Sequence, residues 1–105
     1  MLRSSFVVLA LALAACHRPA GEAGSCHKND NTCVAFSAED GVAGKRMCAG
    51  AGWTPGEKTC PAGSLGTCQY PGETSVMYAG PPNNFTVASA RSTCDFKGGS
   101  FVEAK

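Results

Sequence analysis

The sequence has few aromatic side chains and no excess of either charge. Only 8% of its 105 residues are aromatic, and one of them is a tryptophan. Nine basic residues stand against eight acidic ones, and Arg3 is the only charged residue in positions 1–15. A chain without a basic surface is not expected to bind nucleic acid. A small chain with few large apolar side chains also needs cross-links to reach useful stability.

The spacings that mark common metal and catalytic sites are absent as well. No two cysteines form a CxxC or CxxCH motif, and the only histidines, His17 and His27, lie near the N-terminal end. This disfavours zinc, thioredoxin-like and c-type haem sites, and it leaves no base for a serine nucleophile. GVAGK at 41–45 lacks the spacing of a phosphate-binding loop. We therefore expect no metal, no cofactor and no enzymatic activity, with a zinc site and an enzyme as the weaker alternatives.

Long apolar runs are missing too, and the one run of note lies near the N-terminus. Phe6–Ala14 is unbroken and apolar, but it is only about half of the roughly 20 residues that a spanning helix needs. It follows Arg3 and precedes small residues, which is the three-part pattern of a secretory signal. Residues 1–15 are therefore predicted to be a signal peptide.

The signal ends in LAAC, Leu13 to Cys16, which resembles the lipobox of bacterial lipoproteins. The resemblance implies that a diacylglyceryl group joins the Cys16 sulfur and that the signal is removed before this residue. Two or three acyl chains on one residue would anchor the protein stably to the membrane of the cell envelope. His17, in place of an aspartate that favours inner-membrane retention, points to the outer membrane. An ordinary signal peptide, with Cys16 free for a disulfide, is the alternative.

After the signal, the chain is predicted to divide into a tether and a folded domain. Residues 16–25 are rich in Pro, Gly, Ala and Ser without apolar periodicity, which is typical of a flexible linker. The domain is expected over 26–105. Six cysteines remain there, namely Cys26, Cys33, Cys48, Cys60, Cys68 and Cys94. An even set in a short exported chain indicates disulfides, for which fifteen pairings are possible. We expect Cys26 to pair with Cys33, Cys48 with Cys60, and Cys68 with Cys94.

Two helices are predicted in the domain. Ser37 can cap a helix over 38–49, and Thr86 can cap a second helix from Val87 to about Phe96. Glycines follow both segments, and a short strand over 100–103 follows the second.

A hairpin is predicted between the helices, with strands over 67–70 and 74–78 around the turn Pro71-Gly72-Glu73. Trp53 is expected to fill the small core. The sequence therefore predicts an α+β class: a small disulfide-linked domain with one β-hairpin and two short helices.

CAGAGWTPGEKTCPAGSLGTCQY, followed by SVMYAG and CDFKGGSF, is similar to a pattern in small, cysteine-rich, uncharacterised lipoproteins of Gram-negative bacteria. This resemblance covers roughly 48–101 and implies a fold, with no activity attached. The two helical units also share an order of features that suggests a duplication. Those features are Phe36-Ser37, Cys48 and Gly52-Trp53 in one unit, and Phe85-Thr86, Cys94 and Gly99-Ser100-Phe101 in the other.

The function expected from the sequence is a lipid-anchored, non-catalytic binding or structural module of the cell envelope, with the membrane and an envelope protein as its partners. The alternative is an inhibitor of an envelope or secreted hydrolase, such as a protease or cell-wall enzyme. Exposed loops often carry recognition, and the residues proposed for a recognition surface are Tyr70, Tyr78, Pro81, Pro82, Asn83 and Asn84.

Overall fold

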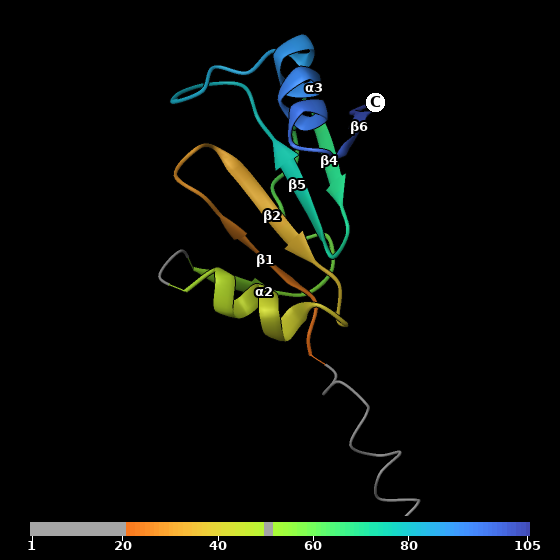
Figure 1. Cartoon of the computed structure of the whole chain (residues 1–105). Helices are drawn as coiled ribbons and strands as arrows, with labels where there is room; N and C mark the ends of the chain where they lie inside the picture. The colour runs from red at the N-terminus through yellow and green to blue at the C-terminus, as the bar shows by residue number, and fades with distance from the viewer. Residues whose placement is uncertain (1–20, 50–51) are drawn as a thin grey trace, which may run out of the picture.

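A computed structural model describes residues 21–49 and 52–105, which form a six-stranded antiparallel sheet with two helices and three disulfides (Figure 1). The sheet order is β3-β1-β2-β5-β4-β6. The strands are β1 (Gly24–His27), β2 (Thr32–Phe36), β3 (Trp53–Pro55), β4 (Gly66–Tyr70), β5 (Glu73–Met77) and β6 (Ser100–Glu103), and the helices are α2 (Gly41–Met47) and α3 (Val87–Phe96). The structure thus agrees with the predicted combination of strands, two helices and disulfides, but most of it is sheet.

The sheet consists of two halves that have the same topology. In each half a hairpin is followed by a helix and then by a third strand, which pairs with the first strand of the hairpin. The N-terminal half is β1, β2, α2 and β3, and the C-terminal half is β4, β5, α3 and β6. Antiparallel pairing of β2 with β5 joins them. The two halves are therefore related by a pseudo-twofold axis between β2 and β5.

The strand register shows which residues correspond in the two halves. Each first strand carries a cysteine opposite an aromatic residue of the third strand, and that cysteine is bonded to a cysteine at the C-terminal end of the helix. The corresponding pairs are Cys26 and Cys68, Cys48 and Cys94, and Trp53 and Phe101. The two halves thus repeat one arrangement of strands, helix and disulfide, although Phe36 corresponds by register to Met77 and not to Phe85 as the sequence parallel suggested.

Both halves also place a glycine beneath the aromatic ring of the third strand. A Cβ atom on Gly24 would overlap the Trp53 ring, and one on Gly66 would overlap the Phe101 ring. A residue with any side chain would push the ring off the sheet. In each half, the glycine leaves room for the aromatic ring to pack against the small core between the sheet and the helix.

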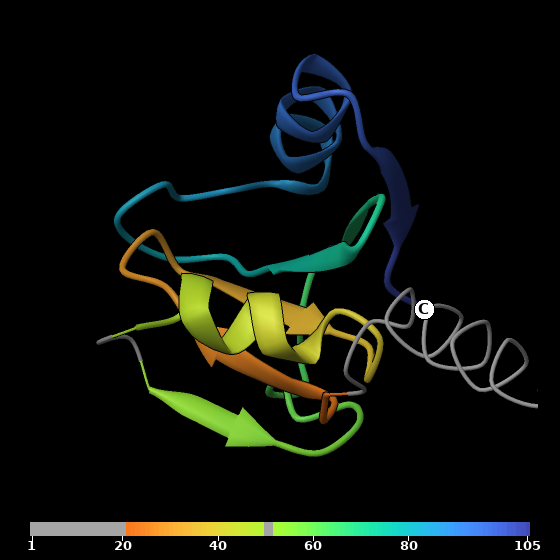
Figure 2. The ribbon, with the colours of Figure 1, turned by 60° about the horizontal axis from the view of Figure 1, so that its bottom comes forward.

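Both helices lie on one face of the sheet, which we call the helix face. Across the sheet, Cys26 of β1 is paired with Val34 of β2, Val34 with Ser75 of β5, and Ser75 with Cys68 of β4. Directly paired residues point to the same side of a sheet, so these four side chains share the helix face. The disulfides of Cys26 and Cys68 attach α2 and α3 to it. Figure 1 shows the two helices at opposite ends of the folded part, with β2 and β5 between them, and Figure 2 shows α2 in front of β1 and β2.

The predicted second helix is confirmed, while the start of the first is wrong. Thr86 caps α3 through a reciprocal pair of bonds, because the Ser89 N–H donates to Thr86 Oγ1 (3.1 Å) and the Thr86 N–H donates to Ser89 Oγ (2.9 Å). Helix α2 begins at Gly41 and not at residue 38, and its N-cap is Asp40 without a side-chain cap bond. Ser37 instead donates its hydroxyl hydrogen to the Asp40 carboxylate (3.2 Å).

The predicted hairpin and final strand are also present, as β4, β5 and β6, with bounds that differ by no more than one residue. The hairpin β1–β2 and the strand β3 were not predicted. Because β1 includes residues 24 and 25, the sheet begins inside the stretch predicted as tether. The chain is already packed at Gly21, whose N–H donates to Ala38 O (3.1 Å). Residues 16–20 lie outside the described part of the chain.

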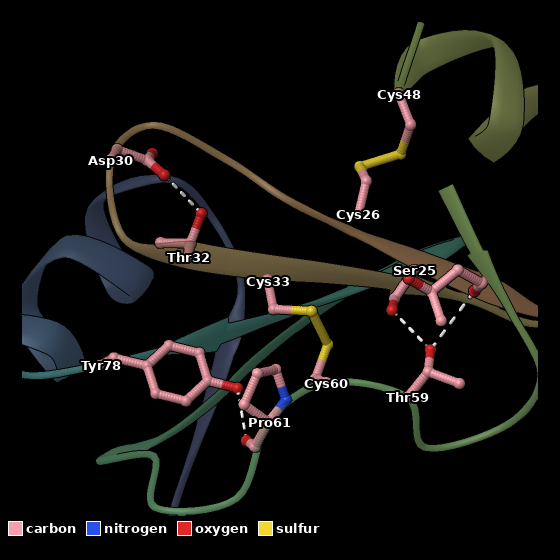
Figure 3. Close-up of a disulfide and its surroundings, with 11 residues drawn as sticks. Ser25, Cys26, Asp30, Thr32, Cys33, Cys48, Thr59, Cys60, Pro61 and Tyr78 are labelled. Atoms are coloured by element: carbon pink, nitrogen blue, oxygen red, sulfur yellow. Dashed lines mark hydrogen bonds between the residues drawn. A yellow bond between two sulfur atoms is a disulfide. The ribbon is translucent and has the colours of Figure 1, made fainter. Parts of the chain in front are cut away.

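One predicted disulfide is confirmed and two are wrong. Cys68 pairs with Cys94 as expected, but Cys26 pairs with Cys48 and Cys33 with Cys60. Cys26 lies opposite Val34 in the β1–β2 hairpin whereas Cys33 lies opposite His27, so the two cysteines point to opposite faces (Figure 3). The face away from the helices, which we call the back face, holds Cys33 and is crossed by the segment 56–65 that contains Cys60.

Cystine sulfur supplies much of the core. Nine apolar residues are buried in the described part of the chain, and five of them are cysteines. The others are Val34, Phe36, Met77 and Ala90. Each bridge closes a loop of 22 to 27 residues, for which loop entropy gives about 3.5 kcal/mol of stabilisation. No helix among residues 21–49 and 52–105 has the length and apolarity needed to cross a membrane.

Tryptic mapping without reduction tests the pairing. Cleavage after Lys28, Lys45, Arg46, Lys58, Arg91 and Lys97 separates the six cysteines of the domain except Cys60 and Cys68, which share one peptide, and Cys16 stays with Cys26 in the peptide that ends at Lys28. We expect the peptide ending at Lys28 to be linked to 47–58, and 29–45 to be linked to 59–91 and 92–97. A link between the peptide ending at Lys28 and 29–45 would contradict the structure.

Candidate functional site

A cleft of about 590 Å³ opens on the helix face where the two halves meet. Its floor comes from the two central strands, with Thr32 opposite Met77 and Val34 opposite Ser75. Both helices are held at the outer parts of the sheet by their disulfides, which leaves a gap between them over a floor in which Thr32, Val34 and Met77 are themselves buried. The lining residues are Lys28, Asp30, Thr32, Val34, Tyr70, Glu73, Ser75, Met77, Asn83, Phe85, Thr93 and Lys97.

The walls of the cleft are the β1–β2 turn, the loop 78–86 and α3. Hydrogen bonds hold the turn against the loop, because the Asn83 side-chain amide donates to Asp30 O (3.0 Å) and the Asn31 side-chain amide donates to Ala79 O (2.8 Å). On α3, Thr93 and Lys97 are one helical turn apart and both line the cleft. The loop is therefore held to the β1–β2 turn at two points, Ala79 and Asn83.

Four charged side chains line the cleft without pairing with one another. They are Lys28, Asp30, Glu73 and Lys97. The only salt bridge among residues 21–49 and 52–105 joins Arg91 to Glu103, outside the cleft. Within the cleft, Asp30 accepts a hydrogen bond from the Thr32 hydroxyl (2.6 Å). The other carboxylate and both ammonium groups have no hydrogen-bonded side-chain partner in the described chain, so they can be contacted by a ligand.

Tyr70 and Glu73 face each other at the end of the β4–β5 hairpin. Burial raises the pKa of the Tyr70 phenol, and the negative charge of Glu73 raises it further. At neutral pH the hydroxyl is therefore protonated and can donate a hydrogen bond into the cleft beside a carboxylate.

Comparison of the two halves separates the framework from the cleft. The framework residues keep their type, with cysteine matched to cysteine, glycine to glycine and one aromatic to another. The cleft residues on either side of the pseudo-twofold axis differ in chemistry. By register the differing pairs are Val34 and Ser75, Thr32 and Glu73, and Lys28 and Tyr70. The cleft therefore has two chemically different ends and suits an asymmetric ligand.

Two of the six residues predicted for a recognition surface line this cleft, namely Tyr70 and Asn83. Tyr78 does not, because its hydroxyl donates to Pro61 O (2.6 Å) next to the Cys33–Cys60 bridge on the back face (Figure 3). Pro81, Pro82 and Asn84 are exposed in the loop beside the cleft. The lipidation site predicted at Cys16 lies outside the described residues.

Sequence reasoning missed the floor and the α3 wall. Thr32, Ser75 and Thr93 are small polar residues within regular elements, where they look like ordinary strand and helix positions. The i, i+4 spacing of Thr93 and Lys97 was a visible signal on a predicted helix. Nothing in the local sequence indicated that β2 and β5 would pair and bring the floor together.

No cluster of three or more His, Cys, Asp and Glu side chains suited to a metal ion is present in the described part of the chain. No family model matches the sequence, and neither a curated protein nor a solved structure matches it. The function of this chain must therefore be inferred from its own sequence and geometry.

The two tyrosines give a pH-dependent test of this geometry. Burial also raises the pKa of Tyr78, so both phenols should ionise above pH 10.0 in the folded protein. The folded state holds these protons more tightly than the unfolded state. Their contribution to stability is therefore complete below pH 10.0 and lost as the pH rises through the raised pKa values.

Ultraviolet titration of phenolate should show a higher midpoint for the native protein than for the reduced, denatured protein. In a Tyr78→Phe background, Glu73→Gln should lower the remaining Tyr70 midpoint, while Glu103→Gln, opposite Gly66 at the other end of β4 from Tyr70, should not. Equal midpoints in native and denatured protein would show that the phenols are not buried.

Proposed function

We propose that this chain is a lipid-anchored protein of the bacterial cell envelope whose disulfide-linked α+β domain binds a polar, charged ligand without catalysis. The observation that carries the binding function is the cleft between the two halves. It is rigidly framed, asymmetric, and lined by unpaired charges of both signs. Pockets of this size are in the range that small ligands occupy.

The anchor is supported by the sequence of the N-terminal segment. A short charged region, an apolar run and the small residues of LAAC come together at Cys16. The three disulfides fit an oxidising compartment outside the cytoplasm. The residue after Cys16 is His17 and not aspartate, which favours attachment to the outer membrane.

An inhibitor is the second candidate, and the loop 78–86 favours it. Pro81, Pro82, Asn83 and Asn84 are all exposed, and hydrogen bonds hold the loop to the β1–β2 turn at Ala79 and Asn83. A preorganised exposed loop is what a hydrolase inhibitor inserts into an active site. Replacing Pro81, Pro82 and Asn84 with glycine and serine, while keeping the Asn83 side chain that lines the cleft, would abolish inhibition of a target hydrolase, whereas a ligand bound in the cleft by Glu73 and Lys97 would be retained.

Intact mass spectrometry of the protein from its native membrane tests the anchor. We expect a species that begins at Cys16, carries the added mass of a diacylglyceryl group, and gains two hydrogens per bridge on reduction. The Cys16→Ala variant should lose the added mass and still contain three bridges. An unmodified Cys16 in the native membrane fraction would refute the anchor.

A blocked cleft tests the binding function. The full-length protein in detergent is screened by ligand-observed NMR against charged amino acids, short peptides, and acidic and amino sugars. Ser75→Trp fills the floor and should weaken binding about tenfold or more. Ser100→Trp, at an exposed position of β6, is the control. A panel without a binder, or a ligand whose affinity survives Ser75→Trp, contradicts the proposal.

A further inference from the structure

The N-terminal end of the described chain lies directly against α2. The Gly21 N–H donates to Ala38 O (3.1 Å), and a Cβ atom placed on Gly21 would meet the backbone and side chain of Val42. Cys16 is only five residues before Gly21, a distance of at most roughly 18 Å when fully extended. If Cys16 carries the acyl chains, α2 is held within that distance of the lipid surface.

The outward side of α2 carries apolar side chains next to one arginine. Gly41, Gly44 and Cys48 are buried against the sheet. At 100° per residue the opposite side of the helix carries two i, i+4 pairs. These pairs are Val42 with Arg46 and Ala43 with Met47. Val42 is 45% exposed and Met47 61% exposed, which makes them two of the four large apolar residues exposed in the described chain.

The charges on α2 suit a phospholipid surface. Lys45 and Arg46 lie in its last turn and are exposed. Long basic side chains can reach phosphate groups while apolar neighbours enter the headgroup layer. Such a short helix would bind a membrane weakly by itself. A tether of five residues raises its effective concentration at the membrane into the range where a weak contact is maintained.

We propose that the outward side of α2, formed by Val42, Ala43, Arg46 and Met47, rests on the membrane surface and orients the domain there. This inference rests on the proposed lipid anchor at Cys16. Its consequence is a fixed orientation, in which α3, at the other end of the molecule (Figure 1), lies away from the lipid.

Fluorescence quenching by brominated lipid tests the contact in full-length lipidated protein, reconstituted in vesicles of phosphatidylcholine and phosphatidylglycerol. Trp53 is the only tryptophan, so Trp53→Phe gives a dark background for a reporter. Met47→Trp places the reporter on the outward side of α2. Phe96→Trp is the matched control, because Phe96 is 93% exposed on α3.

Lipids brominated near the headgroup end of the acyl chains should remove about half of the emission at position 47, as for a side chain about 5–10 Å into the headgroup boundary. Emission at position 96 should be unchanged. Adding Val42→Glu to the Met47→Trp reporter should abolish the quenching through repulsion from phosphatidylglycerol, whereas Ala88→Glu on α3 should not.

The mass spectrum of each reconstituted sample separates the two proposals. Equal quenching at positions 47 and 96, or no quenching at 47 in protein that carries acyl chains on Cys16, overturns the orientation and leaves the anchor intact. Protein without acyl chains on Cys16 in the native membrane overturns both. Quenching at 47 that survives Val42→Glu shows that the reporter tryptophan made the contact, and this also overturns the inference.

Discussion

The structure depends on cystine as a core material. In most domains disulfides reinforce a core of large apolar side chains, but here five of the nine buried apolar residues are themselves half-cystines. Bridges Cys26–Cys48 and Cys68–Cys94 join each helix to its own half of the sheet. Without them, α2, which spans Gly41–Met47, would bury two glycines and little else. Reduction would therefore remove both the covalent link and the contacts that place the helices.

The third bridge has a different role. Cys33–Cys60 lies on the back face and connects β2 to the segment that leads into the C-terminal half (Figure 3). Ser25 and Thr59 share a hydrogen bond (2.5 Å) beside it, and Tyr78 reaches Pro61 from the other half. The β2–β5 seam is therefore held on one face by this segment while the cleft opens on the other. A cleft between two halves keeps its shape only if the halves cannot move apart.

Local signals in the sequence predicted helices and turns correctly where a single residue type strongly favours one backbone conformation. Thr86 marked the start of α3, and Pro71-Gly72 marked the turn between β4 and β5. The strand β1 was missed because its residues, GSCH, lack β-branched and aromatic side chains and resemble a linker. Its place in the sheet comes from pairing on both sides, with β2 and β3.

The pairing of cysteines and the cleft could not be predicted from local signals for a related reason. Which face of a strand a cysteine occupies depends on register, and a shift of one residue reverses it. Cys26 and Cys33 are near in sequence but lie on opposite faces. The cleft forms only when the two halves join through β2 and β5. For this reason only Tyr70 and Asn83 of its lining were identified from the sequence.

The order of strands also determines what the molecule presents to other copies of itself. Because the halves join through β2 and β5, the third strand of each half becomes an edge of the sheet. An open edge can template intermolecular strand pairing. Here β3 spans only Trp53–Pro55, and its proline has no N–H to donate, while β6 ends at the charged Glu103. Two short edges of this kind are poor templates for sheet extension, so the duplicated arrangement protects the protein against aggregation.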